Sequence, residues 1–88
     1  MSLPTYQQFY PIILKSADKP KTADEYVDIV SKALSIGDED LSLRYPSGEG
    51  IVRNRVRWAI HYLRRAQLLE KPSRGIYVIT DRGVAFRK

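Results

Sequence analysis

The sequence contains no cysteine, one histidine and no long apolar run. Disulfide bonds are therefore excluded, and a single histidine without thiolates cannot build a zinc site from the usual nitrogen and sulfur ligands. No stretch approaches the roughly 18 apolar residues that a membrane-spanning helix needs, and no secretion signal opens the chain. We therefore expect residues 1–88 to form one small cytoplasmic domain without cofactor, metal or membrane contact.

Acidic residues are also absent between Glu49 and Glu70. Residues 1–50 carry five Lys/Arg and eight Asp/Glu, a net charge of −3, whereas residues 51–88 carry ten and two, a net charge of +8. A positive charge confined to one part of a chain is typical of proteins that bind a polyanion. The charge pattern favours a nucleic-acid partner over a basic surface that serves only solubility.

The segment from Gly50 to Leu69 has a helical period, and we predict a helix over residues 52–66. Its apolar side consists of Val52, Val56, Ala59, Ile60, Leu63 and Ala66. Its polar side consists of Arg53, Asn54, Arg57, His61, Arg64 and Arg65. Trp58 and Tyr62 lie on one flank, where we expect them to border the core. Arg64 and Arg65 also suit the negative end of the helix dipole, so they need no ligand to explain them.

Two capping boxes predict the earlier helices. The first box is Thr5 to Gln8, and its helix buries Phe9, Ile12 and Ile13, with Tyr6 beside them; we expect a kink or a fresh start at Pro11 and an end by Asp18–Pro20. The second box is Thr22 to Glu25, after a short extended piece at Lys21 and Thr22. That helix should run to about Ser35. Its predicted core residues are Ala23, Tyr26, Val27, Val30, Ala33 and Leu34.

Acidic residues cluster on the second helix. Asp24, Glu25 and Asp28 should form an exposed face, and we expect it to point away from a polyanion. Residues 36–50 show no strong period, apart from a helical turn at residues 38–41 and turn chemistry at residues 45–48. A plain linker is the first interpretation of this loop, and a partner contact from Ser47 or Gly48 is the alternative.

After the basic helix, two apolar runs flank a Pro/Gly-containing turn and predict a β-hairpin over residues 69–80. Tyr77 should face the core. Val84, Ala85 and Phe86 should form a short terminal helix that packs back on the core. Three helices followed by a hairpin, or wing, is the plan of the winged helix-turn-helix, an α+β (mainly α) fold. In that fold the third helix enters the major groove of DNA and the wing contacts the backbone.

This plan assigns DNA contacts to individual residues. We expect Arg53, Asn54 and Arg57 to reach base edges, since arginine and asparagine donate to guanine and adenine there. His61 lies one turn further along, and Arg55 is expected to pair with an acid on the second helix. The full set of predicted DNA-binding residues is Arg53, Asn54, Arg57, His61, Arg64, Lys71, Ser73 and Arg74. The rival interpretation is a protein-interaction domain or a homodimer, because arginine and aromatic residues are also common in protein interfaces.

Several short patterns occur in order along nearly the whole chain. They are Ser47-Gly48, Asn54-Arg55, Trp58-Ala59, Leu63, Arg65-Ala66, Leu68, Ser73-Arg74-Gly75, Thr80 and Gly83. With the opening PTYQQFYPIIL, they make the sequence resemble the N-terminal domain of Mrr-type restriction endonucleases. Gly50 departs from the pattern, because a larger apolar residue is expected there. The hairpin pattern alone is also widespread in bacterial transcription regulators, which leaves a regulator's DNA-binding domain as an alternative.

The resemblance implies a DNA-recognition module that precedes a metal-dependent nuclease domain, in a family that cleaves DNA with modified bases. We therefore expect residues 1–88 to be the N-terminal part of a longer protein. The chain has no spaced Asp, Glu-x-Lys arrangement that holds Mg²⁺ and activates water. Residues 1–88 should accordingly bind double-stranded DNA without cleaving it.

Overall fold

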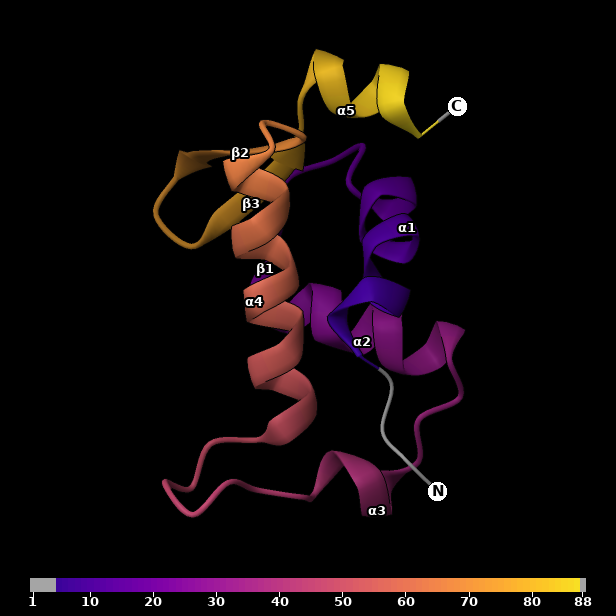
Figure 1. Cartoon of the computed structure of the whole chain (residues 1–88), viewed down its shortest axis with the longest axis vertical. Helices are drawn as coiled ribbons and strands as arrows, with labels where there is room; N and C mark the ends of the chain where they lie inside the picture. The colour runs from indigo at the N-terminus through magenta and orange to yellow at the C-terminus, as the bar shows by residue number, and fades with distance from the viewer. Residues whose placement is uncertain (1–4, 88) are drawn as a thin grey trace.

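The fold is mainly helical, with a small antiparallel sheet, as a computed structural model of residues 5–87 describes it. This confirms the α+β class. The elements in order are α1 (Tyr6–Ser16), β1 (Lys21–Thr22), α2 (Ala23–Ala33), α3 (Asp38–Leu41), α4 (Ile51–Arg65), β2 (Leu69–Ser73), β3 (Ile76–Ile79) and α5 (Asp81–Phe86). Figure 1 shows the loop after α3 at one end of α4, and the β2–β3 hairpin near its other end. None of the helices described here is long and apolar enough to cross a membrane.

The first two helices begin where the capping boxes predict. At α2, the Thr22 hydroxyl accepts from the Glu25 amide at 3.2 Å, and the Glu25 carboxylate accepts from the Thr22 amide at 2.9 Å. At α1, the Thr5 amide donates to Oε1 of Gln8 at 3.0 Å. The helix then continues through Pro11 to Ser16, so of the two alternatives predicted at Pro11, a kink or a fresh start, the fresh start is wrong. The α2 helix ends before Ser35, whose φ of +54° is left-handed.

The core lies where α1, α2 and α4 pack together. Its buried apolar residues include Phe9, Ile13, Leu14, Ala17, Tyr26, Val30, Val52, Val56, Ala59, Ile60 and Leu63. Two predicted core residues are exposed instead, Ala33 in the last turn of α2 and Ala66 just after α4. Ala33 is the last residue of α2, and Ala66 is the C-cap of α4. Tyr6, expected beside the core, is 37% exposed.

The sheet has three strands in the order β1-β3-β2, all antiparallel. The predicted hairpin is present, and its turn contains Gly75 with a φ of +75°, where glycine is favoured. The extended piece at Lys21 and Thr22 pairs with Tyr77 and Ile76 of β3, a contact that was not expected. Two further bonds fix β3 to the helices: Tyr26 donates to the Tyr77 carbonyl at 2.9 Å, and the Ile79 amide donates to the Ala17 carbonyl at 2.9 Å.

The terminal helix α5 packs on the rest of the domain through Gly83 and not through Phe86. Gly83 is buried so closely that a Cβ there would lie 2.3 Å from the Leu68 carbonyl oxygen. With that side turned inward, Phe86 is 67% exposed and Ala85 is exposed. The expectation that Phe86 packs on the core is therefore wrong, and only Val84 is partly covered.

Candidate nucleic-acid interface

The polar side of α4 faces away from the core. Arg53, Arg57, His61 and Arg64 are exposed along it and Asn54 is half-buried. Residues spaced by three or four positions share one side of a helix, so these side chains form a continuous row. Val52, Val56, Ala59, Ile60 and Leu63 are buried on the other side. The helix therefore separates its apolar and basic side chains as its sequence predicts.

A tightly bonded loop leads into the first turn of α4. The Tyr45 amide donates to the Glu49 carbonyl at 2.9 Å, and the Gly48 amide donates to the Tyr45 carbonyl at 2.8 Å. Arg44 and Gly50 form a β-bridge, and Gly48 has a φ of +93° that suits glycine. The predicted turn at residues 45–48 is thus confirmed. The loop places Glu49 beside the basic side of α4.

Glu49 contacts two of the predicted DNA-binding residues. Its Oε2 accepts from Asn54 Nδ2 at 3.2 Å, and its Oε1 lies 3.5 Å from Arg57 Nη1. The Glu49 side chain is 35% exposed, against 58% for Arg57. A hollow of about 360 Å³ is lined by Glu49, Asn54, Arg57, Trp58 and His61. Glu49 was missed at the sequence level, where its only signal is its place as the last acid before the basic helix.

Arg53 is paired with the acidic helix. Its Nε lies 2.9 Å from Oδ1 of Asp24, at the start of α2. The expectation that the acidic face points away from this surface is therefore wrong for Asp24, because α2 crosses close to the first turn of α4. The two side chains are 51% and 74% exposed. An ion pair this open to solvent contributes under about 1 kcal/mol to stability.

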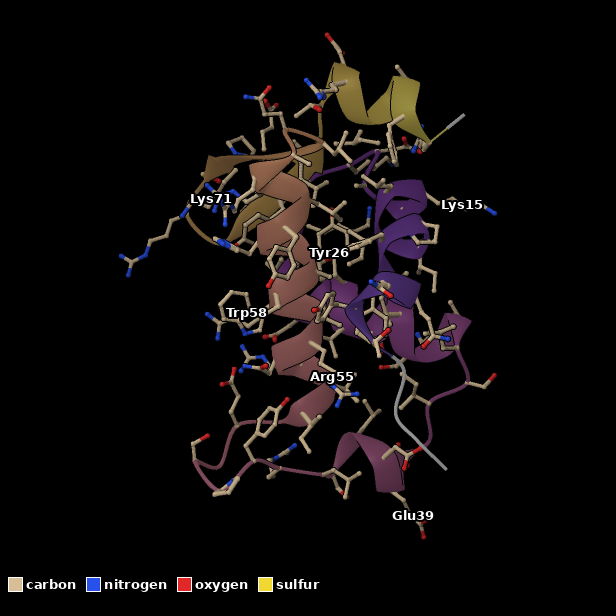
Figure 2. All side chains as sticks on the ribbon, in the orientation of Figure 1. Lys15, Tyr26, Glu39, Arg55, Trp58 and Lys71 are labelled. Carbon is tan, nitrogen blue, oxygen red and sulfur yellow. The ribbon has the colours of Figure 1, made fainter. Side chains whose placement is uncertain are left out.

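The far end of α4 meets the hairpin. A second hollow, of about 340 Å³, is lined by His61, Arg64, Arg65, Leu69, Glu70 and Lys71. Figure 2 shows Lys71 on the hairpin and Trp58 on α4 on the same side of the molecule. The Arg64 guanidinium stacks over the Tyr77 ring, 5.9 Å from its centroid, a cation–π arrangement. Tyr77 is partly buried and packs against the core, as predicted.

The remaining predicted residues lie at the end of the hairpin. Ser73 and Arg74 are exposed beside the turn at Gly75, and they line neither hollow. The structure thus brings most of the predicted residues to α4 and the adjoining strand, and leaves Ser73 and Arg74 at the tip. Within residues 5–87, no three His, Asp or Glu side chains come close enough to hold a metal ion.

Aromatic side chains flank the basic row. Trp58 is 48% exposed and Tyr62 is 38% exposed, with 5.9 Å between their ring centroids. Tyr62 also packs on Tyr6 of α1 at 5.4 Å, and Trp58 meets His61 edge-on at 5.4 Å. The flank therefore joins α1 to α4 and leaves large apolar surfaces open to solvent.

Comparison with known proteins gives two matches. Residues 6–88 match the family described as the Mrr N-terminal domain. The type IV methyl-directed restriction enzyme EcoKMrr of Escherichia coli (strain K12) is 33% identical over 86 residues, covering 94% of this chain and 28% of that protein. The chain thus spans less than a third of its relative's length. No solved structure matches the chain significantly. Because the family match extends from the first turn of α1 to the last residue, the chain belongs to the Mrr N-terminal domain family.

Proposed function

We propose that this domain binds double-stranded DNA as a winged helix-turn-helix. In this proposal α4 enters the major groove and the β2–β3 hairpin contacts the phosphate backbone. The observation that carries it is the row of exposed basic side chains on α4, directly opposite that helix's buried stripe. The hairpin supports it, because exposed Lys71 and Arg74 extend the positive charge beyond the end of α4.

The residues divide into two groups by their reach. Arg53, Asn54 and Arg57 stand in the first two turns of α4, where a helix in the major groove reaches base edges. His61 and Arg64 lie further along, next to the hairpin, and Lys71, Ser73 and Arg74 lie on the hairpin itself. These five are assigned to phosphates, which set the position of a protein on the duplex and carry no sequence information.

The family supplies the context of the proposal. The relative from Escherichia coli is a restriction enzyme, and this chain corresponds to 28% of it. We assign residues 1–88 the role of a single DNA-recognition domain in a cytoplasmic restriction endonuclease. The nuclease activity then belongs to a fused C-terminal domain.

Fluorescence anisotropy of a labelled duplex tests DNA binding, with the 88-residue protein titrated at 50 and 200 mM salt. The logarithm of the binding constant should fall linearly with the logarithm of the salt concentration, with a slope of about −0.9 per phosphate contacted. Arg57→Glu should weaken binding strongly, whereas Arg82→Glu on α5 is the matched control. Absence of binding by the wild type at 50 mM salt would refute the proposal.

A second candidate function is self-association or binding of another protein. It is favoured by the exposed Trp58 and Tyr62, because clustered aromatic side chains are enriched in protein interfaces. Gel filtration at several protein concentrations separates the two functions. A dimer that Trp58→Ala dissociates, together with no DNA binding, supports this candidate.

A further inference from the structure

Glu49 is an acidic residue in the middle of the basic surface of α4, with Asp24 near one end of that surface and Glu70 near the other. Its carboxylate lies between Asn54 and Arg57, two residues assigned to base edges. Near phosphates a carboxylate is repelled, so its position weakens general binding to a duplex. A carboxylate in this position favours DNA binding only where the DNA offers it a hydrogen-bond donor.

We propose that Glu49 and Arg57 together read one C·G base pair in the major groove. The Glu49 carboxylate accepts a hydrogen bond from cytosine N4, and the Arg57 guanidinium donates to O6 or N7 of the paired guanine. The inference rests on the proposed DNA binding, and it names the base pair that this part of the surface selects.

The chemistry of the base edges selects cytosine. An ionised carboxylate is only an acceptor. Guanine and thymine present acceptors in the major groove, and adenine presents the N7 acceptor next to its N6 donor. Cytosine itself presents only the N4 donor, and the acceptor next to it is O6 of the paired guanine, which is assigned to Arg57. It is therefore the base edge that Glu49 meets without repulsion.

The separation of the two side chains fits a single base pair. Cytosine N4 and guanine O6 hydrogen-bond to each other within the pair, about 2.9 Å apart. The acceptor on Glu49 and the donor on Arg57 are 3.5 Å apart. The two protein groups therefore lie side by side at nearly the spacing of the two base groups, with the acceptor facing a donor and the donor facing an acceptor.

Glu49 is also held in place before any DNA binds. The bonds that close the loop, from Tyr45 to Glu49 and from Gly48 to Tyr45, fix its backbone. Asn54 donates to the carboxylate from α4 and orients it. Trp58, which Figure 2 shows on α4, lines the same hollow as Glu49. A base edge therefore meets a preformed group, which lowers the entropy cost of recognition.

Selection from a randomised duplex pool, followed by affinity measurements, tests the inference. The wild type should select a site with a C·G pair at one position, and the preference for that pair should depend on Glu49. In Glu49→Ala, the ratio of affinities for C·G over other pairs at that position should fall about tenfold, the expected effect of removing one base contact. Glu49→Gln should shift the preference toward A·T, because glutamine pairs with adenine N6 and N7. Wild-type affinity should also fall about tenfold when the cytosine is replaced by 2-pyrimidinone, which lacks N4.

Glu39→Ala on α3 is the matched control, since it removes one acidic side chain and leaves the α4 surface unchanged. If Glu49→Ala and Glu39→Ala tighten binding equally on every sequence, Glu49 acts only through its charge and the inference is wrong. If the wild type binds duplexes but shows no preference that depends on Glu49, the inference fails and DNA binding stands. If the wild type binds no duplex at low salt, both fail.

Discussion

The Arg53 guanidinium on α4 and the Asp24 carboxylate on α2 form an ion pair across the two helices, with 2.9 Å between Nε and Oδ1. Both side chains are more than half exposed, so the pair is open to solvent and to ions. A phosphate or a base edge that binds Arg53 must compete with Asp24. If the domain binds DNA as proposed, the acidic start of α2 lowers the affinity of the basic surface for the duplex.

Asp24→Asn should raise the affinity for any duplex a few-fold, because it removes a negative charge beside Arg53. The free energy of unfolding should fall by less than about 1 kcal/mol, since the pair is exposed. Asp28→Asn is the matched control: Asp28 lies on the same helix and pairs with Lys32 at 3.1 Å. Anisotropy titrations should show the gain for Asp24→Asn alone, and an equal gain in both variants would contradict competition at Arg53.

Arg53→Ala and Arg57→Ala should each cost about 1–3 kcal/mol on a preferred site and flatten the sequence preference. The reason is the loss of donors to base edges. Competition titrations with specific and scrambled duplexes measure the difference. Equal losses on both duplexes would reassign these arginines to phosphate contacts.

Arg74→Ala should weaken binding uniformly across sequences. The slope of the logarithm of the binding constant against the logarithm of salt concentration should become shallower by the equivalent of about one phosphate contact. The slope is measured from binding constants at four or more salt concentrations. An unchanged slope would remove the tip of the hairpin from the interface.

Tyr26 should make the stability depend on pH under alkaline conditions. Burial, with a smaller contribution from the Glu25 charge, raises the pKa of Tyr26 from 10.0 to about 12. The folded state therefore favours the neutral phenol. The resulting contribution to the free energy of unfolding is complete below pH 10 and is lost as the pH rises toward 12. Urea unfolding between pH 8 and pH 12 should show the loss in the wild type.

Tyr26→Phe should abolish that part of the pH dependence and cost about 1 kcal/mol at neutral pH, because the Tyr77 carbonyl loses its donor. Tyr45→Phe, on the loop before α4, is the control. The same alkaline loss in Tyr26→Phe and the wild type would show that another group is responsible.

Gly83→Ala should destabilise the domain by about 1–3 kcal/mol, a typical cost of overpacking. The new Cβ would lie 2.3 Å from the Leu68 carbonyl oxygen. This oxygen belongs to the backbone, which cannot move aside as easily as the end of a flexible side chain. At Gly37, by contrast, a Cβ has nothing within 4 Å, so Gly37→Ala is the control. Thermal unfolding compares the two, and equal midpoints would contradict the close packing of α5.

The predictions from sequence succeed where the cause is local. The capping box at Thr22 and Glu25 spans four residues, and the buried stripe of α4 follows from the helical period alone. The hairpin around Gly75 is likewise set by neighbouring residues. Such features need no knowledge of the rest of the fold.

The misses are contacts between distant segments. Lys21 and Thr22 become a strand only because Tyr77 and Ile76 arrive beside them. Arg53 meets Asp24 because α2 crosses α4, and Glu49 reaches Arg57 because the loop turns back. Phe86 is exposed because Gly83 takes the inward position. None of these follows from periodicity or from turn chemistry.

The pairing of β1 with β3 fixes the hairpin to the first third of the chain. The Ile79–Ala17 bond adds a second link between the hairpin and the segment that joins α1 to α2, and α1 and α2 in turn pack on α4. In the proposed complex, α4 and the hairpin would therefore meet the duplex as one rigid body, without a hinge motion on contact. Substitutions that loosen β1 should accordingly slow association and leave the chemistry of every contacting side chain intact.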